Sequence, residues 1–149
     1  MIDPDVRTAE PADVAQLAAL EAEARLALVD QRGGRRWLEE HPLIGEAWPV
    51  RLASDTVLVA FIDDVLVGYA VVVDDGPAIS RVDQVFVTPG AREVGFGDAM
   101  LAAGLAHARE RGAQVFEGEA LPGDRDTKNL YERAGITARL ITVSTRLDR

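Results

Sequence analysis

Two runs of apolar residues separated by a pair of aspartates constrain the fold of this chain more than any other feature. Residues 57–62 and 65–73 are mostly Val, Leu, Ile and Ala, and Asp63-Asp64 stand between them. Near-continuous β-branched runs are typical of strands buried on both faces, and the aspartates mark the turn of a β-hairpin. With the helical segments expected elsewhere in the chain, these strands predict an α/β fold.

The rest of the chain shows no linker, repeat or low-complexity block, so we expect one domain over residues 1–149. A strand at 79–88, a helix beginning near Phe96 and a strand at 114–121 predict a right-handed parallel crossover. The other predicted elements are a strand at 6–10, a helix from Pro11 to Leu28, a short helix at 37–40, a loop bounded by Pro42 and Pro49, a helix at 124–134 and one long strand at 136–147.

Composition excludes several kinds of functional site. The chain has no Cys, which removes disulfides, a thiolate nucleophile and Cys-ligated metals. With only His41 and His107, no histidine-rich metal site is expected either. No stretch reaches the ~20 apolar residues of a membrane span, and the first residues lack the pattern of a signal peptide. We therefore expect a cytoplasmic protein with no membrane partner.

The net charge is strongly negative. Sixteen Lys and Arg against 25 Asp and Glu give −9 with His neutral. Phosphate backbones repel such a chain, so nucleic acid is not an expected partner, and a cationic or neutral small molecule fits better. The alternative explanation is that the acidity only keeps the domain soluble.

The segment from Val85 to Asp98 carries the strongest indication of a binding site. A valine-rich strand leads into a loop in which Gly95 and Gly97 open a helix, where backbone N–H groups are free to point at an anion. Glycine lets a phosphate approach the backbone, and Arg92 adds positive charge at the mouth. This arrangement predicts a pyrophosphate cradle. Glycines that serve only a tight turn or close packing are the alternative.

The spacing Arg92-x-x-Gly95-x-Gly97 resembles the signature of the GNAT superfamily of N-acyltransferases, in which it binds the pyrophosphate of acyl-CoA. Other segments resemble the family in the same order along the chain. Residues 6–13 look like its opening strand and helix, residues 67–70 like its third strand, and residues 129–136 like its Leu-Tyr-x-x-x-Gly-Phe segment. A Rossmann interpretation fits less well, because its glycines would follow the first strand, with an acidic residue ~20 positions later.

The resemblance implies a central mixed sheet of six or seven strands, mostly antiparallel, with splayed parallel strands four and five and about four flanking helices. It implies acetyl-CoA as cosubstrate and coenzyme A as product, with the pantetheine arm in the gap between the splayed strands. The residues that it assigns to this cofactor, largely through backbone groups, are Val85, Phe86, Val87, Arg92, Glu93, Val94, Gly95, Phe96, Gly97 and Asp98.

One departure from the family concerns the pantetheine arm. Many members have an Asn seven residues before the tyrosine, where this chain has Asp124, and Asn129 is displaced towards Tyr131. Asp124 and Asn129 are both kept as cofactor-binding candidates. Asp124 is alternatively only the cap of the helix that follows it.

Tyr131 and Asp83 are the candidate catalytic residues. In the family, a tyrosine at this place lies near the CoA sulfur, and a phenol with a pKa near 10 is protonated at neutral pH and able to donate to the departing thiolate. Family members often place a base on the fourth strand, which indicates Asp83. The alternatives are a Tyr131 that only packs, and an Asp83 that forms an ion pair with Arg81 on the same strand face.

The acceptor site is the least constrained part of the chain. In the family's fold the acceptor site is bounded by the first helices and the loop that connects them. The candidate substrate-binding residues are Arg35, Trp37, Tyr69, Glu117 and Glu119. The arginines of residues 30–37 suggest an acceptor that carries a carboxylate or phosphate beside its amine. Alternatively, the Trp is a core residue and the two glutamates are solvent-facing strand charges.

Together these residues predict an N-acetyltransferase that moves an acetyl group from acetyl-CoA to a primary amine of a small molecule or peptide. The absence of Cys favours direct attack by the amine within a ternary complex. The alternatives are a non-catalytic acyl-CoA-binding module with the same fold, acting as a sensor or interaction surface, and a purely structural domain. Family members commonly dimerise, so a homodimer is also considered.

Overall fold

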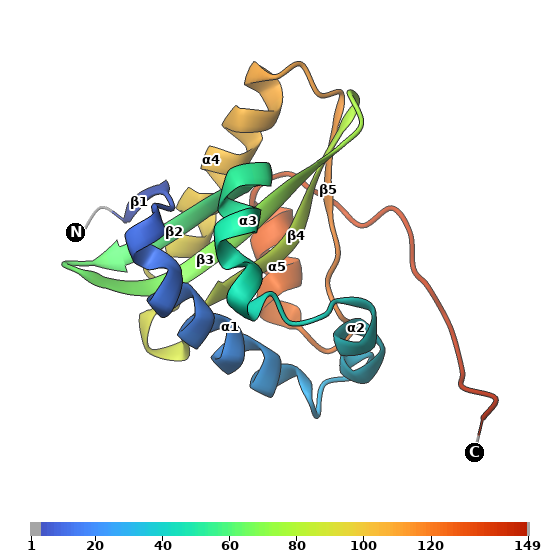
Figure 1. Ribbon diagram of the computed structural model, residues 1–149. Helices are drawn as coiled ribbons and strands as arrows, with labels where there is room; N and C mark the ends of the chain where they lie inside the picture. Colours follow the sequence, from blue (N-terminus) through green and yellow to red (C-terminus); the bar gives the residue numbers. More distant parts are fainter. Residues whose placement is uncertain (1–3, 149) are drawn as a thin grey trace.

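The computed structural model describes residues 4–148, which contain one five-stranded sheet in the order β1-β2-β3-β4-β5 (Figure 1). The first three pairings are antiparallel, and β4 and β5 run parallel, as the sequence predicted. Asp63 adopts a left-handed φ of 53° in the tight β2–β3 turn, which confirms the hairpin. The strands are β1 (Asp5–Thr8), β2 (Thr56–Ile62), β3 (Val65–Asp75), β4 (Ile79–Val87) and β5 (Val115–Gly118).

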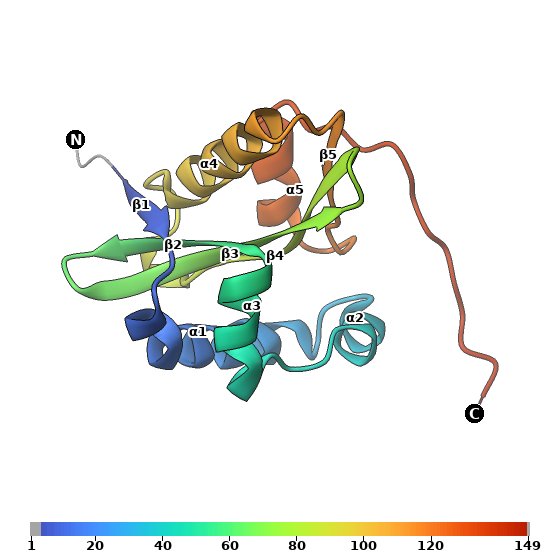
Figure 2. The ribbon, with the colours of Figure 1, turned by 45° about the horizontal axis from the view of Figure 1, so that its top comes forward.

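Helices cover both faces of this sheet (Figure 2). They are α1 (Val14–Leu28), α2 (Gly34–Glu40), α3 (Trp48–Ser54), α4 (Phe96–Glu110) and α5 (Arg125–Arg133). The first three lie on one face, and α4 and α5 lie on the other. Between residues 4 and 148, no helix is both long and apolar enough to cross a bilayer.

The two faces of the sheet bury separate parts of the core. On one face Leu17 of α1 and Trp48 of α3 pack against Tyr69, and all three side chains are almost inaccessible to solvent. On the other face Met100 and Leu101 of α4 fill the space above the sheet. Because β2 and β3 are covered on both sides, every position can be apolar, which explains the continuous β-branched runs.

The structure corrects two predicted element counts. The sheet has five strands in the described residues, not six or seven, and five α-helices flank it rather than about four. The additional helix is α3, which begins at the end of the predicted loop bounded by Pro42 and Pro49 and continues through residues for which no element was predicted. Pro49 lies in the first turn of α3, where proline is tolerated because the N–H there has no helical acceptor, and the burial of Trp48 anchors the helix.

The predicted last strand at 136–147 is wrong. No residue from 137 to 148 belongs to a helix or strand, and all of them are exposed. β-branched residues favour an extended backbone, but a strand exists only where a neighbouring strand satisfies its N–H and C=O groups. β5 is also shorter than its predicted span of 114–121, because its pairing with β4 ends at Gly118.

An ion pair fixes the beginning of the chain to the first helix. Both guanidinium N–H groups of Arg7 donate to the Asp13 carboxylate, at 2.6 and 2.9 Å, and the Glu10 N–H donates to the same carboxylate at 2.7 Å. The hydrogen bonds from Arg7 are the main cause that holds the pKa of Asp13 below its ordinary value, although burial opposes them. The carboxylate therefore stabilises the fold when it is ionised.

Replacing Asp13 with asparagine is expected to lower the free energy of unfolding by about 2 kcal/mol at pH 7, a value reduced from that of a fully buried pair because Arg7 is partly exposed. A lowered folded-state pKa means that the contribution is complete above pH ~4 and is lost as pH falls below it. Urea unfolding at pH 7 and pH 3 should therefore show the difference shrinking at pH 3. Asp5→Asn is the control, and equal stabilities at pH 7 would contradict the assignment.

Candidate active site

The two parallel strands separate partway along their length. β5 pairs with β4 only as far as Val82 opposite Gly118, whereas β4 continues to Val87 with β3 alone as its partner. A cleft of about 1130 Å³ opens where the strands diverge and extends to the N-terminus of α4 and to the loop before α5. The splayed parallel strands that the sequence resemblance implied are therefore present.

A β-bulge in β4 shapes one wall of this cleft. Val71 is paired with Gln84 and Val72 with Val82, so Asp83 is an extra residue without a partner on β3. Bulges re-aim side chains. Here both Asp83 and Gln84 are presented to the face that carries α1 and α3, because Asp83 bonds Arg51 of α3 and Gln84 accepts the hydroxyl of Tyr69.

The loop that follows β4 ends in a cluster of unpaired backbone donors. Glu93 and Gly95 adopt left-handed φ angles of 68° and 92°, which turn the chain into α4. No side chain of residues 4–148 caps this helix, and its first intrahelical hydrogen bond runs from the Ala99 N–H to the Gly95 carbonyl. The N–H groups of the first turn thus have no acceptor among residues 4–148 and can bind an anion, and the helix dipole adds to the attraction.

Arg92 and Asp98 place opposite charges beside this cradle. The Arg92 Nε donates to the Val87 carbonyl at 2.8 Å, and its guanidinium lies over the Phe86 ring at 5.7 Å. These contacts hold the cation at the cleft. Asp98 would repel an anion, but Arg133 of α5 forms a 3.0 Å ion pair with it and offsets that charge.

Tyr131 lies at the point where the strands part. Its side chain is 6% exposed and lines the cleft. Burial raises the pKa of its phenol above the ordinary value, and the carboxylates of Glu119 and Asp124 raise it further. The Tyr69 hydroxyl donates to Gln84 at 2.8 Å, whereas no group among residues 4–148 is hydrogen-bonded to the Tyr131 hydroxyl. The phenol is therefore protonated at neutral pH and faces the cleft with a free donor.

Tyr131 can occupy this place only because residue 118 is glycine. A Cβ on Gly118 would come within 2.6 Å of the ring carbon Cζ and closer still to the hydroxyl. Atoms that are not bonded do not approach so closely, so any larger residue on this strand would displace the ring. Gly118 could not be identified from the sequence, because a glycine in a strand does not indicate which distant side chain, here that of Tyr131, will pack against it.

Asp83 is paired with a different arginine from the one that the sequence suggested. Its Oδ2 accepts from Arg51 at 3.0 Å, while Arg81 bonds Asp75 and Glu117 instead. The other oxygen, Oδ1, lies 4.0 Å from the His41 Nε2. Arg51 was missed because it comes from α3, which the sequence did not predict.

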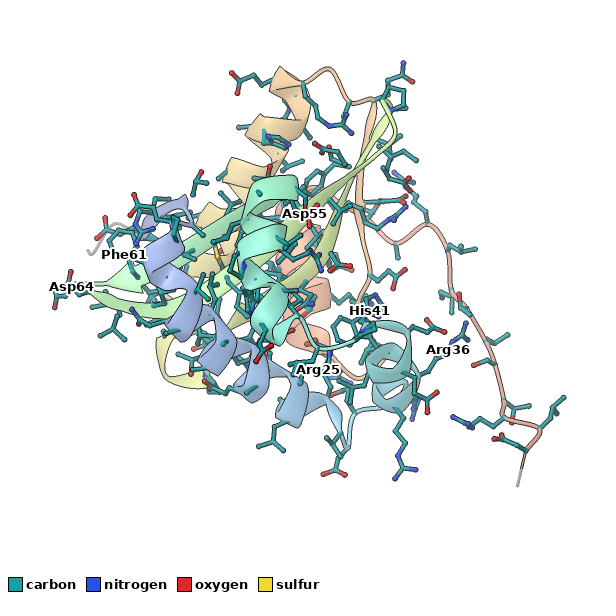
Figure 3. The ribbon with its side chains drawn as sticks, viewed as in Figure 1. Arg25, Arg36, His41, Asp55, Phe61 and Asp64 are labelled. Atoms are coloured by element: carbon teal, nitrogen blue, oxygen red, sulfur yellow. The ribbon has the colours of Figure 1, made fainter. Side chains whose placement is uncertain are left out.

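The far end of the cleft is formed by α1, α2 and the sheet. Trp37 lines it, stacked on the His41 ring at 4.1 Å. Arg25 of α1 donates to the His41 carbonyl at 2.6 Å and ties the two helices together (Figure 3). The fully buried carboxylate of Glu21 accepts the N–H groups of Ile44 and Gly45, which fixes the loop between α2 and α3.

The structure brings most of the candidate residues together. Three candidates do not line the cleft: Arg35, Glu117 and Val94. Arg35 is exposed on α2, and Glu117 forms an ion pair with Arg81. The Asp124 side chain caps α5 by accepting from the Thr127 N–H and hydroxyl. The candidates that line the cleft are Trp37, Tyr69, Asp83, Val85, Phe86, Val87, Arg92, Glu93, Gly95, Phe96, Gly97, Asp98, Glu119, Asp124, Asn129 and Tyr131.

Solved structures of acetyltransferases share this architecture. A ribosomal-protein-alanine N-acetyltransferase from Brucella melitensis biovar Abortus 2308 matches 99% of the chain and 100% of its own, with a TM-score of 0.71 and 22% identity. A predicted acetyltransferase with acetyl-CoA from Clostridium acetobutylicum covers 97% of each chain, with a TM-score of 0.72 and 14% identity. AAC(6')-Iy, in complex with a bisubstrate analogue, covers 97% and 99%, with a TM-score of 0.68 and 18% identity. At these identities the likeness establishes the fold.

Sequence comparison identifies the family. A search of curated proteins finds no match to the chain. The family model described as the acetyltransferase (GNAT) family matches residues 17–136, which include the splayed strands, the glycine loop and Tyr131. The chain therefore belongs to the GNAT family of acetyltransferases.

Proposed function

We propose that the chain transfers an acetyl group from acetyl-CoA to a primary amine by direct attack within a ternary complex. One observation carries this proposal: a single cleft connects the free amides of α4 with the unpaired phenol of Tyr131 and with two carboxylates, those of Asp83 and Glu119. The amides of α4 offer an anion site, the phenol of Tyr131 a proton donor, and the two carboxylates a site for a cationic amine.

The cradle at α4 fits the diphosphate of acetyl-CoA. Within the described part of the chain its backbone donors have no side-chain cap, and Arg92 lies at the mouth of the cleft. The unpaired side of β4 after Val82 offers backbone groups to the pantetheine arm, although the Val87 carbonyl is already bonded to Arg92. Acetyl-CoA supplies the activated thioester carbonyl.

Two residues are proposed to handle protons. Tyr131 protonates the departing thiolate, because its phenol is protonated at neutral pH and its hydroxyl has no competing partner among residues 4–148. Asp83 accepts the proton of the amine, directly or through water. Arg51 holds its Oδ2, which leaves Oδ1 for this role.

The acceptor is proposed to be a cationic amine of a small molecule or peptide. The cleft end near Trp37 carries the carboxylates of Asp83 and Glu119, whereas Arg35 lies outside it. The Arg25 guanidinium, which lies inside the cleft, is engaged with the carbonyls of Leu38 and His41. Two structural neighbours, named a ribosomal-protein-alanine N-acetyltransferase and an aminoglycoside N-acetyltransferase, support an amine acceptor.

The first test is a calorimetric titration with acetyl-CoA. The wild type is expected to bind at micromolar concentrations, and Gly97→Val to bind at least tenfold more weakly, because a branched side chain in the first turn of α4 crowds both Leu130 and the cradle. Gly90→Ala is the matched control, since its Cβ would meet nothing within 4 Å and binding should be unchanged. No binding by the wild type at millimolar acetyl-CoA would overturn the proposal.

The second test is turnover with a panel of amines. The chain has no Cys, so a thiol reagent detects released coenzyme A without background from the protein. Release that depends on a cationic amine is expected. Tight binding of acetyl-CoA with no transfer to any amine of the panel would instead support a non-catalytic binding module.

A further inference from the structure

The His41 side chain lies beside the cleft and has no role in the acetyl transfer proposed above. It is the first residue after α2 (Figure 3), and its ring stacks nearly parallel on Trp37, which lines the cleft. Its Nε2 lies 4.0 Å from Oδ1 of Asp83, another residue of the cleft wall. The two side chains are 23% and 22% exposed, so a small ligand can approach both.

The hydrogen bonds of His41 fix which ring nitrogen carries the proton. Nδ1 lies 2.8 Å from the Trp37 carbonyl oxygen. Because a carbonyl can only accept, Nδ1 is the N–H of the neutral ring and Nε2 carries the lone pair. The residue is also held in place, since Arg25 donates to the His41 carbonyl. Nε2 is therefore an oriented acceptor, and no donor among residues 4–148 is hydrogen-bonded to it.

Asp83 presents a second acceptor to the same space. Arg51 donates to its Oδ2 at 3.0 Å, and no donor in the described part of the chain is bonded to Oδ1. The same guanidinium also donates to Asp55. One cation is thus shared by two carboxylates, which leaves one negative charge without a counter-charge in this group. That charge favours a cationic ligand at Oδ1.

Two acceptors 4.0 Å apart fit the two N–H groups of one amine nitrogen. A nitrogen about 2.9 Å from each acceptor would bind them at an angle of roughly 90°, not far from the tetrahedral angle between N–H bonds. A neutral primary amine has two N–H groups and one lone pair. When both N–H groups are bound, the lone pair points away from the acceptors and is available to a thioester carbonyl. A neutral secondary amine has a single N–H, so it leaves one acceptor unpaired.

We infer that His41 is a substrate-binding residue that, together with Asp83, selects primary over secondary amines. The inference rests on the proposed acetyl transfer and adds no covalent step to it. Asp83 takes a proton of the ammonium, Tyr131 gives one to the sulfur, and His41 only accepts a hydrogen bond. A secondary amine lacks this hydrogen bond when it attacks, so the selection is expressed in kcat/KM.

Two substitutions separate this role from a structural one. In His41→Asn, the side-chain amide nitrogen replaces Nδ1 and still donates to the Trp37 carbonyl, but no atom replaces Nε2. In His41→Gln, the longer side chain can place its oxygen near the position of Nε2. We expect His41→Asn to lower kcat/KM for a primary amine about thirtyfold, and His41→Gln to stay within about threefold of the wild type. A residue that only ends α2 predicts the reverse order.

The decisive measurement compares the best primary amine of the panel with its N-methyl derivative. The wild type should favour the primary amine at least tenfold in kcat/KM. His41→Asn should lose most of this preference, because the secondary amine does not use the missing acceptor. Acetyl-CoA affinity should stay within twofold in both variants. A wild type without the preference, or a preference that His41→Asn leaves intact, overturns the inference.

A binding measurement distinguishes a failure of this inference from a failure of the proposed function. The chain has two His, so a long-range 1H–15N spectrum shows two rings, and His107→Gln identifies the signals of His41. In mildly alkaline buffer the proton should lie on Nδ1, and each primary amine of the panel is then added with coenzyme A. A wild type that acetylates none of them ends the proposed function, whereas a shift of the Nε2 signal still shows amine binding. An Nε2 signal that no amine moves overturns the role of His41.

Discussion

Replacing Tyr131 with phenylalanine is expected to lower kcat about a hundredfold while leaving the affinity for acetyl-CoA within twofold of the wild type. A general acid contributes typically 10²–10⁴-fold, and the hydroxyl is the only part of the side chain that the substitution removes. The ring still packs against Val82 and Leu130, so the fold should be retained. The measurement is initial-rate kinetics with an amine acceptor, alongside calorimetric binding of acetyl-CoA. An unchanged kcat would show that another group, or water, delivers the proton.

The pH dependence of kcat separates a chemical role of Tyr131 from a packing role. Burial and the nearby carboxylates raise the pKa of its phenol above the ordinary value of about 10. The acid therefore stays protonated as pH rises, and kcat should not fall on the alkaline side until pH exceeds about 10. Tyr69→Phe is the informative comparison, because the Tyr69 hydroxyl is already hydrogen-bonded to Gln84. This substitution should lower thermal stability and leave the pH at which kcat begins to fall unchanged.

Gly118→Ala is expected to lower kcat about tenfold or more and to destabilise the fold by roughly 1–3 kcal/mol. The added Cβ overlaps the Tyr131 ring and hydroxyl, so the phenol must move out of the point where β4 and β5 part. Kinetics and urea unfolding measure the two effects. Glu117→Ala, the neighbouring strand residue whose side chain faces Arg81, is the matched control and should change kcat by less than twofold.

Combining the two substitutions shows whether Gly118 acts through Tyr131. If the alanine slows turnover only by displacing the phenol, it should slow the Tyr131→Phe variant far less than it slows the wild type. Independent, multiplying losses would instead mean that Gly118→Ala damages the cleft in another way. Acetyl-CoA affinity should persist in both single variants, because the cradle at Gly95 and Gly97 lies on a different element.

Much of the fold could be predicted from local sequence. The β-branched runs at 57–62 and 65–73 became β2 and β3, and the glycine loop led into α4 near the predicted residue. Even the parallel pairing of β4 with β5 followed from a strand, a helix and a strand in succession. These elements depend on the spacing of apolar residues and on the backbone preferences of each residue type. Both can be recognised from residues that are close together in the sequence.

The parts that failed depend on contacts between distant residues. α3 was missed because a proline near its start was taken as a loop boundary, although buried Trp48 stabilises the helix. Residues 136–147 were predicted as a strand because they favour an extended backbone, but no strand pairs with them within residues 4–148. Asp83 was expected beside Arg81, and the bulge and α3 gave it Arg51 instead.

The sequence by itself determined the β2–β3 hairpin, the succession of β4, α4 and β5, the open N-terminus of α4 and the absence of a cysteine nucleophile, because residue type and spacing along the chain are enough to specify them. Only the tertiary structure decided that β4 and β5 part at Val82 and Gly118, and that Tyr131 fills the space a missing Cβ leaves there. This site depends on the packing of β4, β5 and α5 against one another. These segments are distant in the sequence, so no single stretch of residues shows how they will pack.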